Sequence, residues 1–546
     1  MRCAEREHHD TLGGRSSAAR HPAGGGARVR AALADQVPAL RRAVPAELSA
    51  APRFGRSRVS SRSGTSTPQD RDMSTPPRTA PGSRIDPRRT ATRHALALVL
   101  ALCAACDSPV EPRGRTGALI LSAQVEEPGG PIFRTLHLRL DSPAGVEVEY
   151  WTDDAPRLRV RRDAAADSQV VPLARLRADR TYEYEARAIG ADGRPGPPFT
   201  GQFTTGPLPA DLAAISFTAT GTPGVPLVLL HLYRQDGFAG YAAVEGSGSV
   251  VWYYRTVDLP FGIARRANGN FIAMDKGRGL LELTPAGEVL HELPQDEAGR
   301  NQHHDAITTP QNTVLFIAFD WREYDGRPIA GEAIWEWEPE TGVAVKRWSA
   351  HDFLDPAVDR TERSTDDDWL HANSLAIGAR GNILVSLRRL NQIISIAPDW
   401  SAIEWRLGGP GATIPFADGD LFTGQHTAAE VAPDRILLFD NRHDLGGYSR
   451  AAEYDISDGE ARTVWEWRPA RDNFAFAVSS ARRLAGGNTL VGFGMSPGLN
   501  GSTGPIEVYE VSPAGEVLWH LVVDGPFVMY RAEPLQTIAG ETIVTQ

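Results

Sequence analysis

The stretch GNILVS, residues 381–386, is one of six short β-rich runs that begin at a turn and recur along the second half of the chain. The runs start 42, 70, 53, 53 and 53 residues apart. They are GNFIAM from Gly269, QNTVLF from Gln311, GNILVS from Gly381, DRILLF from Asp434, GNTLVG from Gly487 and GETIVT from Gly540. Internal similarity at such a period is typical of folds in which each repeat forms one small sheet.

Each of the first five runs is followed by a strand, a turn and an aromatic strand, as in LLELTPAGEVLHEL and IEVYEVSPAGEVLWHL. A sixth copy of this second signature, GYAAVEGSGSVVWYY from Gly240, precedes the first run, whereas the run at Gly540 has no sequel. The two incomplete halves complete each other if the chain closes into a ring, with a C-terminal strand finishing the blade that begins near Pro226. The pattern predicts an all-β fold with a six-bladed β-propeller over residues 208–546.

Residues 116–207 contain alternating runs such as LHLRL and VEVEYW, separated by Gly and Pro turns. This pattern predicts a small β-sandwich domain, and the segment from Leu176 to Tyr184 resembles fibronectin type III and immunoglobulin-like sandwiches. We assign no chemistry to this domain.

The composition of the first 115 residues is typical of targeting and linker segments rather than of a folded domain. Residues 1–72 are rich in Arg, Ala, Gly and Ser, and we expect them to be disordered or to lie upstream of the true start. Residues 73–106 resemble a secretory signal peptide, with basic residues before the apolar run ALALVLALCAAC. This run ends in a lipobox-like stretch in which Cys106 is the candidate lipidated residue, and a plain signal peptide cut nearby is the alternative. Residues 107–115 are then a linker, and the protein is exported to the periplasm or cell surface.

Charge and cysteine content limit the possible partners. Residues 1–105 carry 18 Arg against 8 Asp and Glu, a local charge of +10, so the total of −11 leaves −21 for the remaining chain. An acidic body is a poor match to a polyanion, so we expect no nucleic-acid partner, and contact with a membrane only through the lipid anchor. The only cysteines are Cys3, Cys103 and Cys106, so the mature body has no disulfide and no thiolate metal site.

Histidines recur at one phase of the repeat. His303 and His304 precede Asn312 by nine and eight residues, His371 precedes Asn382 by eleven, and His426 precedes Arg435 by nine. In a ring, equal phase means that the three positions converge where the chain enters the inner strands. Arg388 ends the strand after His371 and can reach the same space, whereas His351 and His443 lie off the phase and are interpreted as structural or exposed.

Several imidazoles beside a guanidinium fit two kinds of chemistry. Three histidines can hold zinc, but an arginine beside them argues against a cation and for an anion. The other candidate is transfer of a tetrahedral anionic group, in which a neutral imidazole attacks while Arg and His donors neutralise the oxygens. Sulfuryl groups carry less charge than phosphoryl groups, so this transfer requires no metal in principle.

The strings HHDA, DWLHANS, ILVSLRRLNQI, EWRLGG, GQHT and YSRAAEYD resemble the bacterial arylsulfate sulfotransferase family over residues 225–546. Members of that family are six-bladed propellers that do not use the nucleotide sulfate donor. The resemblance implies that His426 is a nucleophile that becomes transiently sulfated and that His371 and Arg388 bind sulfuryl oxygens. The remaining catalytic histidine is His304, with His303 as the alternative. The residues implied in substrate binding are Asn373, His303 and Arg450.

The implied reaction is ping-pong transfer from an aryl sulfate to a phenol, without a cofactor or metal. Two other classes of function remain open, a surface-anchored propeller that only binds ligands and a metal-dependent hydrolase that uses these histidines. The 70-residue interval also holds an insert, SAHDFLDPAVDRTERSTDDD, whose acidic residues either repel anionic donors or form a solvated surface turn.

Overall fold

The computed structural model describes residues 117–295, 301–417 and 419–545, and their regular secondary structure is almost entirely β-strand. The predicted disordered segment, the signal peptide with Cys106 and the linker to residue 115 lie outside the described residues. In the described part of the chain, no helix has the length and apolarity needed to cross a membrane. The helices are α1 (Ala210–Ala213) and three single 3₁₀ turns, η1 (Ala350–Asp352), η2 (Arg388–Leu390) and η3 (Leu499–Gly501).

The N-terminal region forms a β domain with its own core. Its strands are β1 (Ile120–Glu126), β2 (Arg134–Trp151), β3 (Leu158–Leu173), β4 (Thr181–Ile189) and β5 (Phe199–Thr204). The long strand β2 pairs with β1 along its first part and with β4 along its second, while β3 pairs with both parts. Alternate residues of β4, such as Tyr182 and Ala186, are fully buried in this core, as the period of two of a half-buried strand requires. The likeness to fibronectin type III stays a prediction.

The predicted six-bladed propeller is confirmed. Each blade is an antiparallel sheet, and its innermost strand contacts the innermost strand of the next blade. Blade one contains β30 (Val528–Leu535), β7 (Leu227–Tyr233), β8 (Ala239–Val244) and β9 (Val250–Arg255). Blade two contains β10 (Pro260–Arg265), β11 (Phe271–Asp275), β12 (Gly279–Leu283) and β13 (Val289–Pro294). Blade three contains β14 (Gln302–Thr308), β15 (Val314–Tyr324), β16 (Arg327–Glu338) and β17 (Val343–Ser349).

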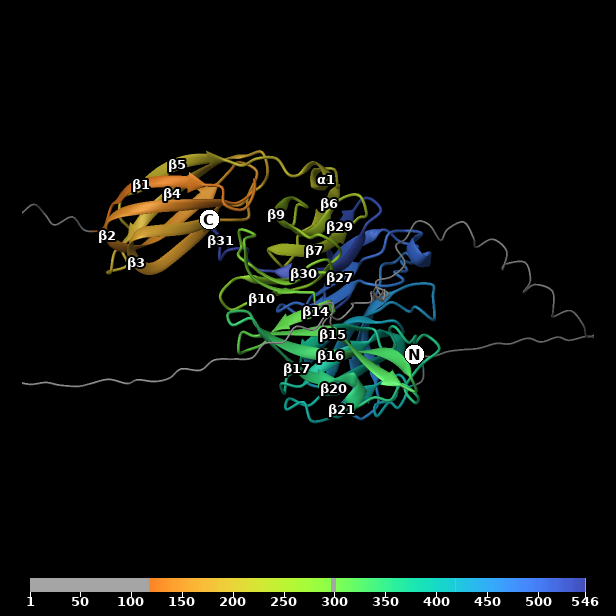
Figure 1. Ribbon diagram of the computed structural model, residues 1–546. Coiled ribbons are helices and arrows are strands. Elements are labelled where there is room, and N and C mark those ends of the chain that lie inside the picture. Colours follow the sequence, from red (N-terminus) through yellow and green to blue (C-terminus); the bar gives the residue numbers. More distant parts are fainter. Residues whose placement is uncertain (1–116, 296–300, 418, 546) are drawn as a thin grey trace, which may run out of the picture. The chain divides into compact units, whose positions relative to one another are not determined.

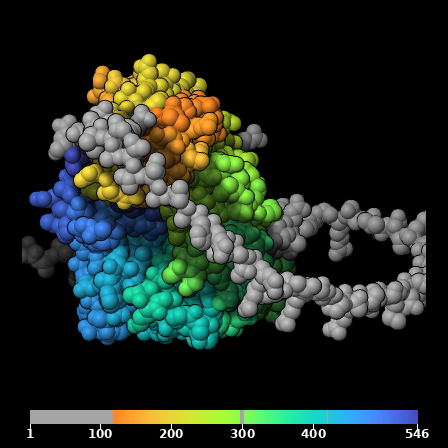
Figure 2. Space-filling model, turned by 90° about the vertical axis from the view of Figure 1, so that its left-hand side faces the viewer, coloured from red at the N-terminus to blue at the C-terminus, as the bar shows by residue number. Residues whose placement is uncertain are grey.

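The remaining blades follow in chain order, and Figure 2 shows the green, teal and blue surfaces of consecutive blades next to one another. Blade four contains β18 (Ala372–Ile377), β19 (Ile383–Leu387), β20 (Gln392–Ile396) and β21 (Ile403–Leu407). Blade five contains β22 (His426–Ala432), β23 (Arg435–Asp440), β24 (Arg450–Asp455) and β25 (Arg462–Trp467). Blade six contains β26 (Ser480–Arg483), β27 (Thr489–Phe493), β28 (Ile506–Val511), β29 (Val517–Val523) and, at its outer edge, β6 (Phe217–Gly221).

The ring closes in blade one, as expected, but not through the predicted segment. The inner strand β30 pairs with β7, and the two strands lie side by side in Figure 1. The run from Gly540 was expected to complete the propeller. Its strand β31 (Thr542–Ile543) instead pairs with β3 of the N-terminal domain. The run at Gly540 resembles the blade runs in sequence. However, it follows β30, which already fills the inner position of blade one, and its strand pairs with the N-terminal domain.

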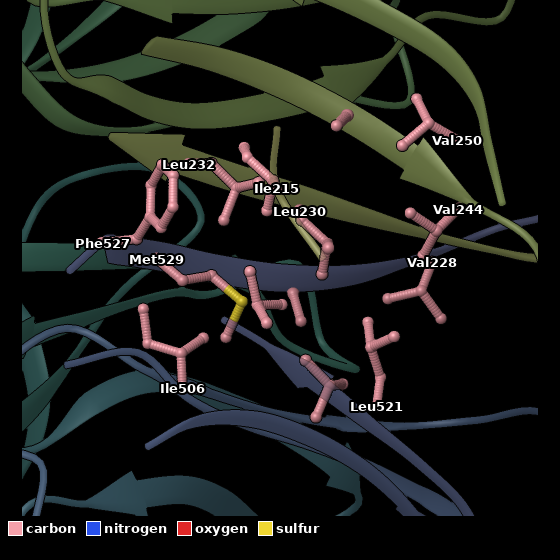
Figure 3. Packing of buried hydrophobic residues seen from close by; sticks show 14 of the residues in the cluster. Ile215, Val228, Leu230, Leu232, Val244, Val250, Ile506, Leu521, Phe527 and Met529 are labelled. Atoms are coloured by element: carbon pink, nitrogen blue, oxygen red, sulfur yellow. The ribbon is translucent and has the colours of Figure 1, made fainter. Parts of the chain in front are cut away.

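A buried apolar cluster holds the closing blade to its neighbour. Leu230 on β7 and Met529 on β30 pack with Ile506 and Leu521 of blade six, and Figure 3 shows these side chains between the two sheets. Leu230 and Met529 are completely buried. Burying a Leu side chain contributes roughly 1.5–3 kcal/mol, so this cluster stabilises ring closure.

Polar bonds between neighbouring inner strands repeat around most of the ring. In four successive steps, a side-chain oxygen on one inner strand accepts a backbone N–H of the next. The bonds are Leu375 N–H to Asp305, Ala428 N–H to Ser374, Ala481 N–H to Thr427 and Ala532 N–H to Ser480, with donor–acceptor distances of 2.9, 3.2, 3.1 and 3.0 Å.

A left-handed residue lies at or shortly before each acceptor of this ring. The four residues are His304, His371, Thr427 and Val478, with φ between 55° and 62°. Such a conformation is unusual for a residue other than glycine. Each of these residues lies where the chain enters the inner strand of a blade. The conformation therefore sets the direction of the side chains at the start of that strand.

We expect the closing cluster to dominate stability. Replacing Leu230 by Ala should lower the free energy of unfolding by about 2–5 kcal/mol, because it leaves a cavity between two sheets. Urea denaturation followed by circular dichroism measures the change. Val257→Ala is the control, because that side chain is 74% exposed and its loss should change stability by less than about 0.5 kcal/mol. Equal effects would contradict the role given to this cluster.

Candidate active site

The first two predicted histidines meet at the inner strands. The ring centroids of His304 and His371 lie 4.7 Å apart, and His304 also stacks on Phe261 at 5.0 Å. His303 packs instead on Phe319, at 4.2 Å, and its Nδ1 lies 2.7 Å from Nδ1 of His304. Because only one of these two nitrogens can carry the proton, the pair has complementary tautomers. The structure therefore places His304 against His371, with His303 behind it.

A buried carboxylate orients His371. Nδ1 of His371 lies 2.6 Å from a carboxylate oxygen of Asp368, which also accepts a hydrogen bond of 2.9 Å from Nε of Arg389. Burial alone raises the pKa of Asp368, but His371 and Arg389 outweigh it and hold that pKa below its ordinary value. The ionised Asp368 fixes the proton of neutral His371 on Nδ1 and leaves the lone pair on Nε2.

His426 is held in one tautomer by bonds to both of its ring nitrogens. Nδ1 lies 2.7 Å from the amide oxygen of Asn441 and 3.1 Å from the carbonyl oxygen of Gly424, and both of these groups are acceptors. The Asn441 amide nitrogen donates to the carbonyl oxygens of Ala475 and Val478, which fixes the orientation of its amide. Nδ1 of His426 therefore carries the proton, and Nε2 accepts the backbone N–H of Val478 at 3.2 Å. A neutral imidazole in this tautomer presents the nucleophilic lone pair at Nε2.

The electrostatics of the cluster favour neutral imidazoles. Burial lowers the pKa of His303 to about 3, and burial together with neighbouring histidines lowers the pKa of His304 well below its ordinary value. Burial and then Arg388 lower the pKa of His426 in the same way. The pKa of His371 is also lowered by burial, although Asp368 opposes the change. At pH 7 the site therefore contains uncharged nucleophiles and acceptors.

Arg388 is a buried cation without a carboxylate partner among the described residues. Its Nη2 lies 2.9 Å from Nδ1 of His443 and 3.4 Å from the carbonyl oxygen of Phe476, while its buried Nε has no hydrogen-bond partner among those residues. Burial, followed by the charges of Arg363 and Arg389, lowers the pKa of Arg388 to about 10, so it stays charged at pH 7. A guanidinium in this state is stabilised by an incoming anion.

Asn373 belongs to the polar layer that crosses the inner strands. Its side-chain nitrogen donates to the carbonyl oxygen of Gln425, next to His426. Its own carbonyl oxygen accepts bonds from Arg531 and Tyr530. Asp305 binds Arg531 through two bonds of 2.7 and 2.9 Å. Asn373 thus connects blades one, four and five beside the histidines, while its buried amide oxygen has no partner among the described residues.

The hydrogen bonds of Arg450 are made to residues other than the clustered histidines. Its Nε donates to Asp440 at 3.1 Å, and its other nitrogens bind Glu466, the carbonyl oxygen of Leu421 and the hydroxyl of Tyr454. These contacts lie within blade five and the segment before it. Arg450 therefore holds the end of β23, directly before Asn441, and its role in substrate binding stays a prediction.

The acidic insert of blade four is neutralised by arginines. Asp359 binds Arg406, and Asp366 binds Arg360. Arg363 from the same insert pairs with Asp444, and its charge acts on Arg388. Neither interpretation of the insert from the sequence anticipated this arrangement, because the pairing arginines lie both inside and outside the insert.

Three residues of the site escaped sequence analysis for different reasons. Asp368 stands three residues before His371 in the quoted motif DWLHANS, so spacing was a usable signal. Asn441 follows the strand run DRILLFD, and only its contact with His426 reveals its role. His443 was interpreted as structural or exposed, but it binds Arg388, whereas His351 has the expected structural role through bonds to Tyr324 and to the backbone.

In the described part of the chain, no three His, Cys, Asp or Glu side chains are arranged to hold a metal ion. The site of this propeller contains His426, whose proton is fixed on Nδ1, and Arg388, whose charge has no carboxylate partner among the described residues. This combination suits nucleophilic transfer of an anionic group.

The family model described as arylsulfotransferase (ASST) matches residues 220–525, and the chain belongs to this family. No curated protein matches the chain. Solved structures with a similar fold include a protein of unknown function from Bacteroides caccae, at 14% identity and a TM-score of 0.39, covering 56% of this chain and 98% of that one. They also include a catalytically inactive virginiamycin B lyase from Staphylococcus aureus with quinupristin, at 10% identity and a TM-score of 0.31, covering 56% and 99%.

Buried neutral histidines predict acid sensitivity. His231 on β7 is fully buried, and neither of its ring nitrogens has a hydrogen-bond partner among the described residues. Burial lowers its pKa to about 3. Between pH 6.5 and 3 the unfolded state binds a proton that folded His231 does not, so stability falls as the pH is lowered through this window. Each such histidine contributes a slope of about 1.4 kcal/mol per pH unit.

The test measures the free energy of unfolding between pH 5 and 7. His231→Leu should reduce the slope of stability against pH by roughly one histidine's share. Val257→Leu, at a side chain that is 74% exposed and does not titrate, should leave the slope unchanged. An unchanged slope in His231→Leu would contradict the prediction, because it would mean that folding does not change the protonation of this histidine.

Proposed function

We propose that this arylsulfotransferase moves a sulfuryl group from an aryl sulfate to a phenolic acceptor by a ping-pong mechanism through a sulfohistidine at His426. The observation that carries the proposal is the tautomer of His426, whose proton is fixed at Nδ1 by Asn441 and Gly424. This leaves Nε2 as the atom that can attack sulfur. Family membership supports aryl sulfate and phenol as the substrate classes.

In the first half-reaction, the Nε2 lone pair forms a bond to sulfur as the bond between sulfur and the aryl oxygen breaks. The electron pair of that bond leaves with the phenolate. His426 becomes an imidazolium that carries a sulfuryl group at Nε2 and keeps its proton at Nδ1. Asn441 binds that proton through a neutral oxygen. A neutral partner stabilises the positive ring less than a carboxylate would, so the sulfuryl group can still be transferred to the second phenol.

Arg388 and His371 act on the sulfuryl oxygens. Arg388 has no carboxylate to neutralise it among the described residues, so the incoming sulfuryl group is its charge partner. An anion beside His371 favours its protonated form, which Asp368 also favours, and Nε2–H can then donate to a sulfuryl oxygen. Because these groups are already buried and oriented, they stabilise developing charge without reorganising during the reaction.

The activity test uses a chromogenic aryl sulfate with and without an added phenol. Phenol-dependent release should occur in the unmodified protein and fall by about a thousandfold or more in His426→Ala, because the attacking atom is gone. A chelator should have no effect. Release that the chelator abolishes would instead indicate a metal-dependent hydrolase. Absence of release from a folded protein over a range of donors would indicate a binding module.

A second variant separates catalysis from stability at Arg388. Arg388→Met should lower kcat/KM by about 10²–10³, because a charged donor to the sulfuryl oxygens is lost. The same change should leave the free energy of unfolding unchanged or raise it, because it removes a buried charge that has no carboxylate partner among the described residues. Arg435→Met, which removes a surface ion pair with Asp455, is the matched control and should retain activity. Parallel losses of stability and activity in Arg388→Met would show a structural role.

A further inference from the structure

The segment from Asn473 to Ser479, which connects β25 to β26, contacts several groups of the site through its backbone. The carbonyl oxygens of Ala475 and Val478 accept from Asn441, and that of Phe476 accepts from Arg388. The N–H of Val478 points at the opposite side of the His426 ring, where it lies 3.2 Å from Nε2. One stretch of backbone thus touches the nucleophile, its orienting amide and the anion-binding arginine.

Val478 is held in an unfavourable conformation to make this contact. Its φ is 55° and that of Ser479 is 83°, and a positive φ at a β-branched residue is rare. The neighbouring groups maintain it, because the N–H of Ser479 donates to the carbonyl oxygen of Tyr530 and the hydroxyl of Ser479 accepts from the N–H of Gly494. Conformations of this kind are unfavourable and persist where the surroundings impose them, often at functional sites.

The hydrogen bond to Nε2 cannot survive the proposed reaction. Once Nε2 is bonded to sulfur, it has no lone pair left, and the buried N–H of Val478 loses its acceptor. Leaving a buried N–H without an acceptor is unfavourable. The reaction itself brings new acceptors to the adjacent atom, since the sulfur on Nε2 carries three oxygens.

We propose that the backbone N–H of Val478 moves from Nε2 to a sulfuryl oxygen as the bond between nitrogen and sulfur forms. This inference rests on the proposed function. The amide fixes the lone pair in the resting protein and then stabilises the sulfuryl oxygens in the transition state and in sulfohistidine. No proton is transferred in this change of acceptor. When a second phenol attacks as its phenolate, the bond between nitrogen and sulfur breaks, its electron pair returns to Nε2, and Nε2 again accepts the N–H.

The test replaces this single N–H by an oxygen. Incorporation of 2-hydroxy-3-methylbutanoic acid at position 478 converts the amide to an ester and keeps the Val side chain. The matched control is lactic acid at position 481, where the N–H of Ala481 donates to Thr427 in the same region. Thermal unfolding of both proteins confirms that each is folded before the kinetics are compared.

Two reactions of His426 are then measured. One is the first burst of phenol from the aryl sulfate, in which the transferred group carries oxygens. The other is methylation of His426 by methyl 4-nitrobenzenesulfonate, followed by mass spectrometry, in which the transferred group carries none. We expect the ester at 478 to slow the sulfuryl burst by about 10²–10³ and to leave methylation as fast or faster, because the lone pair is no longer engaged.

Three results would overturn the proposal. Equal slowing of both reactions would mean that the N–H only positions the ring. An unchanged or faster burst would mean that it makes no contact with the sulfuryl oxygens. Equal slowing by the esters at 478 and 481 would mean a general loss of structure. A missing burst in the unmodified protein is a separate result, because it refutes sulfuryl transfer itself.

Discussion

The hydrogen bonds that pass from one inner strand to the next are the constraint on which this site depends. In each of the four steps, a side-chain oxygen on one blade holds a backbone N–H of the following blade, and a left-handed residue lies at or shortly before the acceptor. Two of those left-handed residues are His304 and His371, and a third directly follows His426. The contacts that join the blades therefore also set the positions of the groups that we assign to catalysis. A change in blade packing would move the chemistry with it.

Burial lowers the pKa of both kinds of base in the site, but the outcome at pH 7 differs. It removes charge from the histidines, because a neutral imidazole needs less solvation, and it leaves the arginine charged but without compensation. The result is an uncharged nucleophile beside a cation that lacks a carboxylate partner among the described residues. At a surface, water and salt ions would compensate the charge of the arginine, so an incoming anion would be attracted less strongly. The tautomer of His426 completes the arrangement, and Asn441 fixes it through a neutral oxygen rather than a carboxylate.

Much of the fold could be predicted from the sequence, because each blade repeats the same strand and turn pattern. The phase of the repeat also located His304, His371 and His426, and Arg388 followed from the strand after His371. The pattern was wrong for Gly540, whose run resembles a blade strand but pairs outside the propeller. Arg450 matched a motif, yet its bonds lie within its own blade and the segment before it. Asn441 and Val478 carry no motif at all, because their roles arise from contacts with His426 across 15 and 52 residues of sequence.

Closure by β30 also has a kinetic consequence. Blade one joins a strand near residue 530 to strands that begin at residue 227, so its contacts span some of the longest sequence separations in the protein. Forming such contacts late is expected to make folding slow, because loop-closure entropy must be overcome before the pairing contributes. During synthesis, β7 remains an open sheet edge until nearly the whole chain has emerged. Until that moment, strand addition by another chain competes with the correct partner.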